Sequence, residues 1–553
     1  MDVASVGGAA GANTTVKSLR VLLASSLRCR GREAWLAACV IPFALAAVAR
    51  SRDPLFLNHD VALYLECGRQ LLEGKLPYVD FIDLNPPLVM YLHAAPAAVA
   101  KWLSMPAPAA FDLWLLGFAA VQLAVFVGAL RELGRAGQCG RPERTAFLCV
   151  AGWFALGGVF FGQREHVLPL AIAPYLAMRW GRWAAGTARP AGGGELWAGF
   201  AAALAAFLKP HFLAIVAAPE VAWGVRALAR RAGGWRAVAP LAAGESLAFW
   251  GTGVAYLAHF ALLPGAVREA FFGRIVPLVV SGYSVYAEPV WPAAAWLGAA
   301  AAGLFAAAAW LGARRHGWSD TIEPLALMSL MASVAYFAQG KGWAHHALPA
   351  AAAGVLLVSA VAGRLTLLAA RRFPRAARVA GRCGPAALAF TLVAVQVARV
   401  PPPQRNPYLD LVLRLSAREE PVAFLSTDVF PGFPTLVQAG RPAGCRYLFC
   451  FPVPMLYRSD GASSPRPAAS GPYRLRAEEQ SPQERRFLVE TREDLAVRRP
   501  RLVFVAGTRS QACPPGFSMH EYLERTGVLS ALRPGYERLG ALPPYVVYRR
   551  LGD

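Results

Sequence analysis

The sequence contains few charged residues for its length, and acidic residues are the scarcer kind. Charged residues make up 16% of the 553 positions, and 34 Asp and Glu stand against 56 Lys and Arg. None of the nine cysteines forms a Cys-x-x-Cys pair, so the spacing of a zinc site is absent. No internal repeat of the length found in solenoid proteins is evident. These absences exclude a metal-stapled domain and a repeat architecture.

What the sequence has in abundance is apolar residues, at 56% of the chain. Several apolar runs reach the roughly 18–20 residues that cross a bilayer. We therefore expect an α-helical polytopic membrane protein. The net charge of +22 does not indicate a nucleic-acid partner, because most arginines lie in short clusters between apolar runs. That pattern is typical of membrane topology.

The arginine clusters predict which side of the membrane each turn faces. A basic leader, 1–33, is expected in the cytoplasm, and a transmembrane domain, 34–399, follows it with an acidic outer loop at 51–110. A cleaved signal peptide ending near Ala49 is the less favoured alternative, because many spans follow. About eleven spans are expected, at 34–50, 111–130, 145–161, 166–181, 196–208, 212–229, 237–263, 291–312, 321–338, 346–370 and 384–399.

One apolar run, 87–103, does not fit this count of crossings. It contains Pro96 and ends at Lys101 and Trp102. Helices that lie along a membrane surface often end in this way. We expect an interfacial or re-entrant helix on the outer side.

The segment 400–553 is polar and predicts a soluble α/β domain on the periplasmic side. Runs rich in β-branched and aromatic residues predict strands at 421–427, 501–507 and 545–550, and 519–532 predicts a helix. Outside the cytoplasm a disulfide can form, most simply between Cys445 and Cys450, and Cys513 is the third cysteine of this segment.

Polar motifs gather in the turns expected to face outward. They are "NHDVALY" from Asn58, the stretch Gln163–His166, "LKPHF" from Leu208 and "QGKGWAHH" from Gln339. The turns on the cytoplasmic side contain mainly Arg, Gly, Pro and Ala. Ionisable groups at membrane level are costly and mark function by default. The outer side is therefore expected to be the functional one.

Asp60 opens the first of these motifs and has two interpretations. A carboxylate near the membrane surface suits a general base that takes a proton from an acceptor hydroxyl or amine. The same "NHD" sequence is also good N-capping chemistry for the helix that follows. The two roles are compatible.

The other outer turns supply positive charge. A phosphate or diphosphate leaving group needs cations where its charge develops. Snorkelling of long side chains at helix ends is the alternative for each residue taken singly. The candidates for phosphate or donor binding are Arg164, His166, Lys209, His211, Lys341, His345 and His346.

Glu165 is a second candidate for the catalytic machinery. It could orient Arg164 or His211, or hold a divalent cation together with Asp60. Two carboxylates without a third ligand leave a metal cofactor open. Nearby aromatic residues, including Tyr283 and Trp291, could line a path for sugar or lipid or belong to an aromatic belt.

The first outer loop carries a family resemblance. Its segment "LECGRQLLEGKLPYVDFIDLNPPLVMYL" contains Pro86-Pro87-Leu88 and resembles the corresponding loop of GT-C type membrane glycosyltransferases, which include protein O-mannosyltransferases and lipid A aminoarabinose transferases. Asp60 matches the essential aspartate of that loop, and Glu165 falls where the family has a second acid. Asn85 replaces the lysine expected before the two prolines, and His59-Asp60 replaces an acidic pair.

The resemblance implies transfer of a sugar from a polyprenyl-phosphate donor at the outer face of a bacterial cytoplasmic membrane. The acceptor would be a lipid, a glycan or a protein, and Asp60 would deprotonate it for inverting attack. Membrane lipids are the other expected partners. Two alternatives use the same cations: a transporter or flippase for a lipid-linked glycan, and a polymerase or ligase with an undecaprenyl-diphosphate donor.

Overall fold

A computed structural model gives the fold. It describes residues 32–552 apart from 54, 137–138, 140–141, 188–191, 231–237, 288–293, 317–321, 374–390, 392–405, 460–471, 508–512, 515 and 534. Nearly all of the leader 1–33 and of the predicted span 384–399 therefore lies outside the described residues, as does Trp291.

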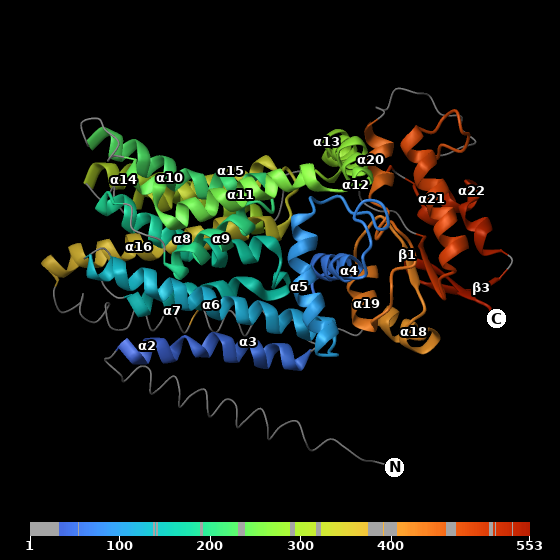
Figure 1. The fold of residues 1–553 in the computed structure, drawn as a ribbon, viewed down its shortest axis with the longest axis horizontal. Coiled ribbons are helices and arrows are strands. Elements are labelled where there is room, and N and C mark those ends of the chain that lie inside the picture. Colours follow the sequence, from blue (N-terminus) through green and yellow to red (C-terminus); the bar gives the residue numbers. More distant parts are fainter. Residues whose placement is uncertain are drawn as a thin grey trace, which may run out of the picture.

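Most of the chain forms a bundle of helices that run along one axis (Figure 1). Each of the first ten predicted spans coincides with one of these helices or with a pair of them. The helices are α2 (Arg32–Ala38), α3 (Val40–Arg52), α6 (Ala107–Arg135), α7 (Pro142–Gly157), α8 (Arg164–Ala185), α9 (Gly193–Ala206), α10 (Pro210–Arg230), α11 (Gly244–Leu262), α14 (Ala294–His316), α15 (Ile322–Ala338) and α16 (Leu348–Arg372).

Within the described residues, three helical segments are long and apolar enough to cross a membrane: Ala107–Arg135, Pro210–Ala229 and Trp296–Arg315. A fourth crossing is possible if the pair Gly244–Leu262 and Gly265–Tyr286, bent by 106°, counts as one broken span. Helices α7, α9 and α15 are shorter, and α8 carries more charge. The total of eleven crossings therefore stays a prediction.

Two helices lie at the end of the bundle that faces the C-terminal residues, here called the domain-side end. They are α4 (His59–Leu72) and α5 (Leu88–Trp102). Figure 1 shows α5 running across the bundle axis, in keeping with the helix that we expected not to cross. A methyl group at Gly68 of α4 would lie 2.5 Å from the backbone oxygen of His93 of α5, so only glycine permits this close packing.

A run of four short helical elements, here called the interrupted segment, lies at the same end. It consists of α12 (Gly265–Ala270), the π-helical turn η4 (Phe271–Ile275), α13 (Val276–Gly282) and the 3-10 turn η5 (Tyr283–Tyr286). It follows the bend after α11 and packs between the bundle and the C-terminal residues (Figure 1).

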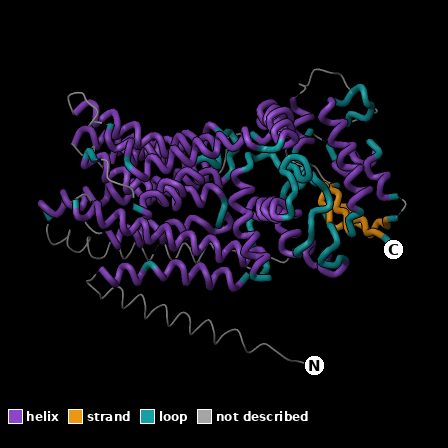
Figure 2. The backbone as a smooth tube through the Cα atoms, in the orientation of Figure 1, coloured by secondary structure: helices purple, strands orange, loops and turns teal. Residues whose placement is uncertain are grey.

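The C-terminal residues form a small α/β domain, as predicted from the strand patterns, and Figure 2 shows its strands gathered away from the bundle. The sheet has the order β1-β2-β4-β3, with β1 parallel to β2 and the other pairs antiparallel. Its strands are β1 (Val422–Leu425), β2 (Leu502–Ala506), β3 (Tyr536–Leu542) and β4 (Tyr545–Arg550). Around it lie α18 (Pro407–Leu415), α19 (Gly432–Ala439), α20 (Pro452–Ser459), α21 (Pro482–Arg498), α22 (Met519–Arg525) and η8 (Val528–Leu532).

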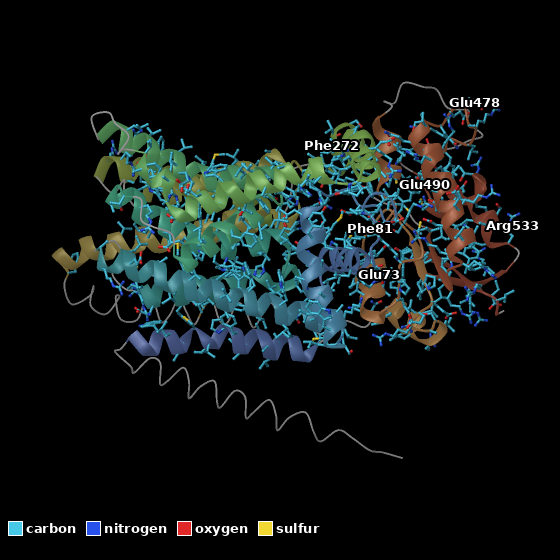
Figure 3. The ribbon with its side chains drawn as sticks, in the orientation of Figure 1. Glu73, Phe81, Phe272, Glu478, Glu490 and Arg533 are labelled. Carbon is cyan, nitrogen blue, oxygen red and sulfur yellow. The ribbon has the colours of Figure 1, made fainter. Side chains whose placement is uncertain are left out.

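The domain is docked on the outer loop and on the interrupted segment. The backbone N–H of Ile82 donates to the carbonyl of Arg446 at 2.7 Å. Arg274 of η4 pairs with Glu490 of α21 at 3.3 Å, and Figure 3 labels Glu490. A methyl group at Gly282 would lie 2.6 Å from the Cβ of Met455 in α20. Backbone, charge and close packing thus hold the domain to the bundle.

The cysteines of this domain correct one prediction. Cys445, Cys450 and Cys513 are free thiols in the structure, so the disulfide that was possible between Cys445 and Cys450 is not formed. The thiol of Cys445 instead donates to Asp494 at 3.4 Å. The burial of this thiol in the domain core agrees with a packing role.

Candidate functional site

The four polar turns singled out in the sequence meet at the domain-side end of the bundle. One precedes and opens α4, one opens α8, one joins α9 to α10, and one joins α15 to α16. Their side chains contact one another across separations of about 40 to 140 residues in the chain. The expectation that these turns share one face of the molecule is therefore met by the geometry.

Asp60 lies in the first turn of α4 with a partly exposed side chain. The N-cap of that helix is Asn58, whose side-chain oxygen accepts from the backbone N–H of Asp60 at 3.0 Å. The capping role considered for Asp60 thus belongs to Asn58. The amide of Gln163 donates to the Asp60 carboxylate at 3.1 Å and to Asn58 at 2.8 Å. Gln163 therefore fixes the orientation of a carboxylate that solvent still reaches.

Arg164 is held by the outer loop. Its guanidinium donates to the side-chain oxygen of Asn85 at 2.7 Å and lies 5.0 Å from the ring centre of Tyr64. The amide of Asn85 in turn donates to buried Asp83 at 2.9 Å. Asn85 takes the place of the lysine that the family resemblance led us to expect. It serves as an uncharged support for Arg164.

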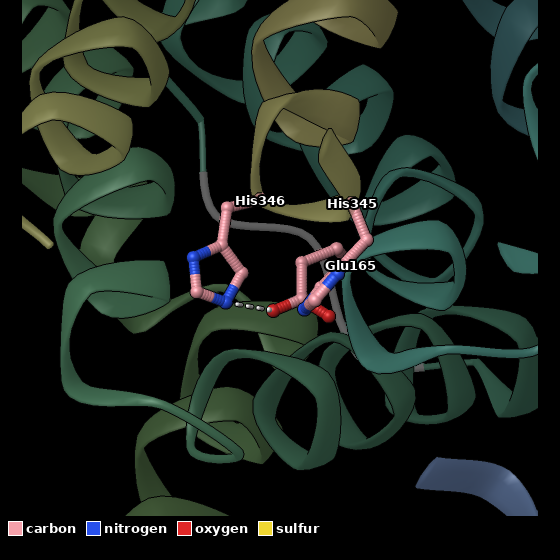
Figure 4. A group of neighbouring side chains, drawn as sticks. All are labelled: Glu165, His345 and His346. Carbon is pink, nitrogen blue, oxygen red and sulfur yellow. Dashed lines mark ion pairs between the residues drawn. The ribbon is translucent and has the colours of Figure 1, made fainter. Parts of the chain in front are cut away.

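Glu165 lies beside two histidines, His345 and His346, of the 3-10 turn η6 (Ala344–Ala347) that precedes α16, and Figure 4 shows the three side chains together. Its carboxylate forms an ion pair with Lys209, and the Nε2 atom of His346 lies 3.6 Å from the same oxygen. The Lys209 ammonium lies 3.4 Å from that Nε2 atom. Burial lowers the pKa of Lys209, and the carboxylate of Glu165 acts in the opposite direction. Glu165 thus positions Lys209.

The same residues, Glu165, His345 and His346, include the kinds of side chain that bind metal ions. Glu165, His345 and His346 each offer one ligand atom, and these atoms lie within 4.8 Å of one another. Imidazole and carboxylate ligands suit divalent transition metals. However, the Lys209 ammonium already contacts the Glu165 oxygen that would be a ligand. A second cation there would meet a like charge, so these residues do not fit a metal in this arrangement.

Lys341 is the most unusual group in the site. Only 4% of the residue is exposed, and its ammonium has no hydrogen-bond acceptor among the described residues. It lies 2.9 Å from the ring centre of Tyr283 and 4.7 Å from that of Trp343. Burial, together with the charges of Lys209 and Arg164, lowers the pKa of Lys341 to about 6. A cation held by aromatic faces alone is ready for an anion.

Two glycines give Lys341 its position. Gly340 and Gly342 have φ of +62° and +66°, a left-handed conformation that other residues rarely adopt. The chain reverses there and turns the lysine inward toward the aromatic rings. The Gly-Lys-Gly pattern is the signal by which the sequence could have predicted this buried cation.

The remaining histidines differ in what they can do. His345 and His211 lie in the cluster, and the Nε2 atom of His211 has no partner among the described residues. His166 lies outside it. Its Nδ1 accepts from the backbone N–H of Gly162, its Nε2 lies 2.9 Å from the carbonyl of Trp153, and its ring stacks on the Trp153 ring. Both nitrogens are taken, so the expected role of His166 in donor binding has no support here.

A second buried ionic cluster lies at the opposite end of the bundle, here called the far end. Arg179 of α8 has no exposed surface, and each of its side-chain nitrogens has a partner. Glu220 accepts from Nε and one terminal nitrogen, and the carbonyl of Pro240 and Glu245 accept from the other. From the sequence we expected the turns at this end to contain mainly Arg, Gly, Pro and Ala, and we did not predict that Glu220 and Glu245 would pair with Arg179 here. These two glutamates neutralise Arg179, and the cluster therefore has a structural role.

Comparison with known proteins gives matches of fold only. No family model and no curated protein matches the chain. Among solved structures, ArnT from Cupriavidus metallidurans bound to undecaprenyl phosphate is 13% identical, with a TM-score of 0.47, and the match covers 92% of this chain and 98% of that one. The oligosaccharyltransferase AglB from Archaeoglobus fulgidus, in complex with an inhibitory peptide and a dolichol-phosphate, is 13% identical with a TM-score of 0.42.

The match to AglB covers 74% of this chain and 64% of that one, so the chain spans under two thirds of that relative. Both structures are of the GT-C kind that the sequence resembles. Because the TM-scores lie below 0.5, these likenesses establish neither a family nor an activity for this chain.

Proposed function

We propose that the protein is a membrane glycosyltransferase that moves a sugar from a polyprenyl-phosphate donor to a lipid, glycan or protein acceptor. The observation that carries this proposal is the buried ammonium of Lys341, which has no hydrogen-bond acceptor among the described residues. Charging this buried amine without a partner costs several kcal/mol, which is why its pKa is lowered and the free amine is largely neutral at pH 8. An anionic ligand would remove that cost, and a phosphate is the anion that Arg164 and Lys209 nearby would also stabilise.

The cations are suited to the leaving group. When the bond between the anomeric carbon and the phosphate oxygen breaks, the electron pair stays on the oxygen and the lipid phosphate gains negative charge. Lys341 and Arg164 would stabilise that charge as it forms. Lys209 would join them by sharing its ammonium between the phosphate and Glu165. Glu165 is thus a positioning residue in this proposal.

Asp60 is suited to the other half of the reaction. Its carboxylate is partly exposed and oriented by Gln163. It would take the proton from the acceptor hydroxyl or amine as the acceptor atom bonds to the anomeric carbon. With base and cations on opposite sides of the sugar, attack would come from the face opposite the phosphate. The transfer would then invert the anomeric configuration.

An apolar hollow along the bundle supports a lipid-linked donor. It has a volume of about 60 Å³ and lies between α6, α7, α8 and α16. Leu123, Phe126 and Leu356 contribute to its lining. Trp153 also lines the hollow. Its ring stacks on that of His166, which lies two residues after Arg164. A hollow of this size accepts only a small part of an isoprenoid chain; the rest would run along the apolar surface of the helices, with its phosphate at the cations.

The experiment that tests the proposal is mass spectrometry of cell-surface glycans and glycolipids in cells with and without the protein. The wild-type protein should add a sugar that the Asp60→Asn variant does not add, because a lost general base costs about 10²–10⁴-fold in rate. Glu73→Gln removes an exposed carboxylate at the end of the same helix and is the matched control. Full transfer by Asp60→Asn would refute the role of Asp60, and a lipid moved across the membrane without a new glycosidic bond would favour a flippase.

The proposed location is a bacterial cytoplasmic membrane, with the N-terminus in the cytoplasm and the C-terminal domain in the periplasm. The arginine-rich turns at the far end support this orientation. A reporter enzyme active only outside the cytoplasm, fused after Asp553, should be active. An inactive periplasmic reporter together with an active cytoplasmic one would reverse the orientation.

A further inference from the structure

The C-terminal domain contains a cavity of about 150 Å³ that the proposed reaction does not use. We propose that this cavity binds a saccharide unit of the acceptor; its assignment to the acceptor rests on the proposed function, whereas saccharide binding itself does not. The cavity is lined by Tyr408, Ser426, Thr427, Asp428, Phe430, Pro431, Ala506, Cys513, Phe517, Met519, Pro544 and Tyr545.

The cavity lies where the sheet topology favours a ligand. Strands β1 and β2 are parallel and buried, and their carboxyl ends meet at the same edge. Ser426, Thr427 and Asp428 follow β1 directly, and Ala506 ends β2. In open α/β sheets, ligands bind outside the carboxyl ends of parallel strands. The sheet continues on the other side of β2 into antiparallel β4, so the parallel pair stands at its edge.

The lining has the two kinds of surface that a sugar ring requires. A pyranose presents an apolar face of C–H groups and an edge of hydroxyl groups. Tyr408, Phe517 and Tyr545 offer aromatic surface, and Tyr408 and Tyr545 meet edge to face at 5.6 Å. The buried hydroxyl of Thr427 can donate and accept hydrogen bonds, whereas that of Ser426 already bonds to Tyr545 and to the backbone N–H of Asp428.

The rim of the cavity supports the same inference. Phe430 lies at this rim and is 57% exposed, so its ring is open to a ligand. Asp428, two residues before it, is also exposed, and its backbone N–H donates to the hydroxyl of Ser426 at 3.1 Å. An aromatic ring and a carboxylate on one short loop form a platform for stacking and an acceptor for sugar hydroxyls.

Short contacts connect this cavity with the cationic cluster. The backbone oxygen of Ser426 accepts from Cys450 at 2.7 Å. The next residue, Phe451, accepts from the hydroxyl of Tyr286 at 3.4 Å, and the Tyr286 ring centre lies 6.0 Å from the Lys341 ammonium. A short chain of contacts therefore joins the two sites. An acceptor glycan held in the cavity would be positioned relative to the site of transfer.

Saturation-transfer NMR on the full-length protein in lipid nanodiscs tests the proposal. The probes are the methyl glycosides of glucose, mannose, galactose and N-acetylglucosamine. At least one should bind the wild-type protein through its ring C–H groups, and Phe430→Ala should weaken it by about tenfold, as expected for a lost stacking ring. Asp428→Asn should weaken it to a similar extent.

Leu413→Ala is the matched control, because Leu413 is 50% exposed on α18 of the same domain and lies outside the cavity. Absence of binding to the wild-type protein, or equal binding to wild type and both cavity variants, would overturn the proposal. Asp60→Asn separates the two proposals: it should lose transfer and keep glycoside binding. Glycoside binding that depends on Phe430 in a protein without transferase activity would retain the cavity site and reject the reaction.

Discussion

Both ends of the bundle bury ionisable side chains, but the two ends differ in how far protein groups supply the hydrogen-bond partners of those side chains. Helix α8 contributes to both clusters: Arg164 and Glu165 begin it, and Arg179 lies roughly 22 Å further along. At the far end every nitrogen of Arg179 has a protein partner. At the domain-side end Lys341 has only aromatic faces. A cluster completed by the protein stabilises the fold, whereas an incomplete one is kept for a ligand.

The largest expected effect is a loss of protein stability when the far-end cluster is disrupted. Arg179→Ala leaves the partly buried Glu220 without its cation and leaves Glu245 with Arg182 alone, which should cost about 3–5 kcal/mol. The midpoint of thermal unfolding of the purified protein should fall sharply. Arg315→Ala, at an exposed arginine of α14, should leave it unchanged. An equally stable Arg179→Ala protein would mean that the far-end cluster is not structural.

Lys341→Met should leave the stability of the protein intact and weaken its binding of an anionic ligand. It removes a buried amine that has no hydrogen-bond partner among the described residues, so the unfolding midpoint should stay the same or rise. A polyprenyl phosphate should stabilise the wild-type protein against unfolding, since it binds the folded state alone. In the variant this stabilisation should fall by about 1.5–3 kcal/mol, the value of a hydrogen bond to a charged group. A variant as unstable as Arg179→Ala would make Lys341 a structural residue.

The pH dependence of anion binding sharpens the same contrast. With the pKa of Lys341 at about 6, its side chain is mostly neutral at pH 8 in the free protein. Because the anion binds the ammonium form, affinity should rise as pH falls from 8 to 6, by up to about tenfold per unit. Lys341→Arg keeps its charge throughout and should flatten the profile. Titration of the phosphate itself is common to both proteins, so equal slopes would reject the prediction.

The smallest expected effect concerns Lys209. Lys209→Ala leaves the buried carboxylate of Glu165 beside His345 and His346 without its ammonium. A divalent transition metal could then compensate that charge, so the variant should retain about one Zn²⁺ per chain after dialysis. The wild-type protein and the Lys209→Ala/His345→Ala double variant should retain none at this position. Zinc retained equally by all three would show that Lys209 does not occupy the place of a metal.

The sequence predicted the helices and the meeting of the polar turns because both follow from local features. Apolar runs and arginine clusters mark the positions of the helices, and the scarcity of reactive groups elsewhere left only a few turns to consider. The buried strands β1 and β2 were predicted for the same reason. Strand β3 was not, because as an exposed edge strand it contains Glu537, Arg538 and Gly540 and has little apolar character.

The partners within the site could not be predicted, since they come from distant parts of the chain. Gln163 contacts Asp60 and Asn85 contacts Arg164 across 103 and 79 residues. The glutamates of the far end pair with Arg179 across 41 and 66 residues. Local pattern reveals that a charge is present but not which group completes it. The same limit explains why the sequence left the Cys445–Cys450 disulfide open, which the structure does not form.

The contact of Gly282 with Met455 has one more consequence. Because the two helices touch where even a methyl group would not fit, the C-terminal domain cannot slide over α13; it can tilt only by carrying α13 with it. The residue after Gly282 is Tyr283, whose ring covers the Lys341 ammonium. Any rocking of the outer domain would therefore lift this ring away and admit water to the lysine. Docking of a bulky acceptor on the domain could set the charge state of a residue that the acceptor never touches.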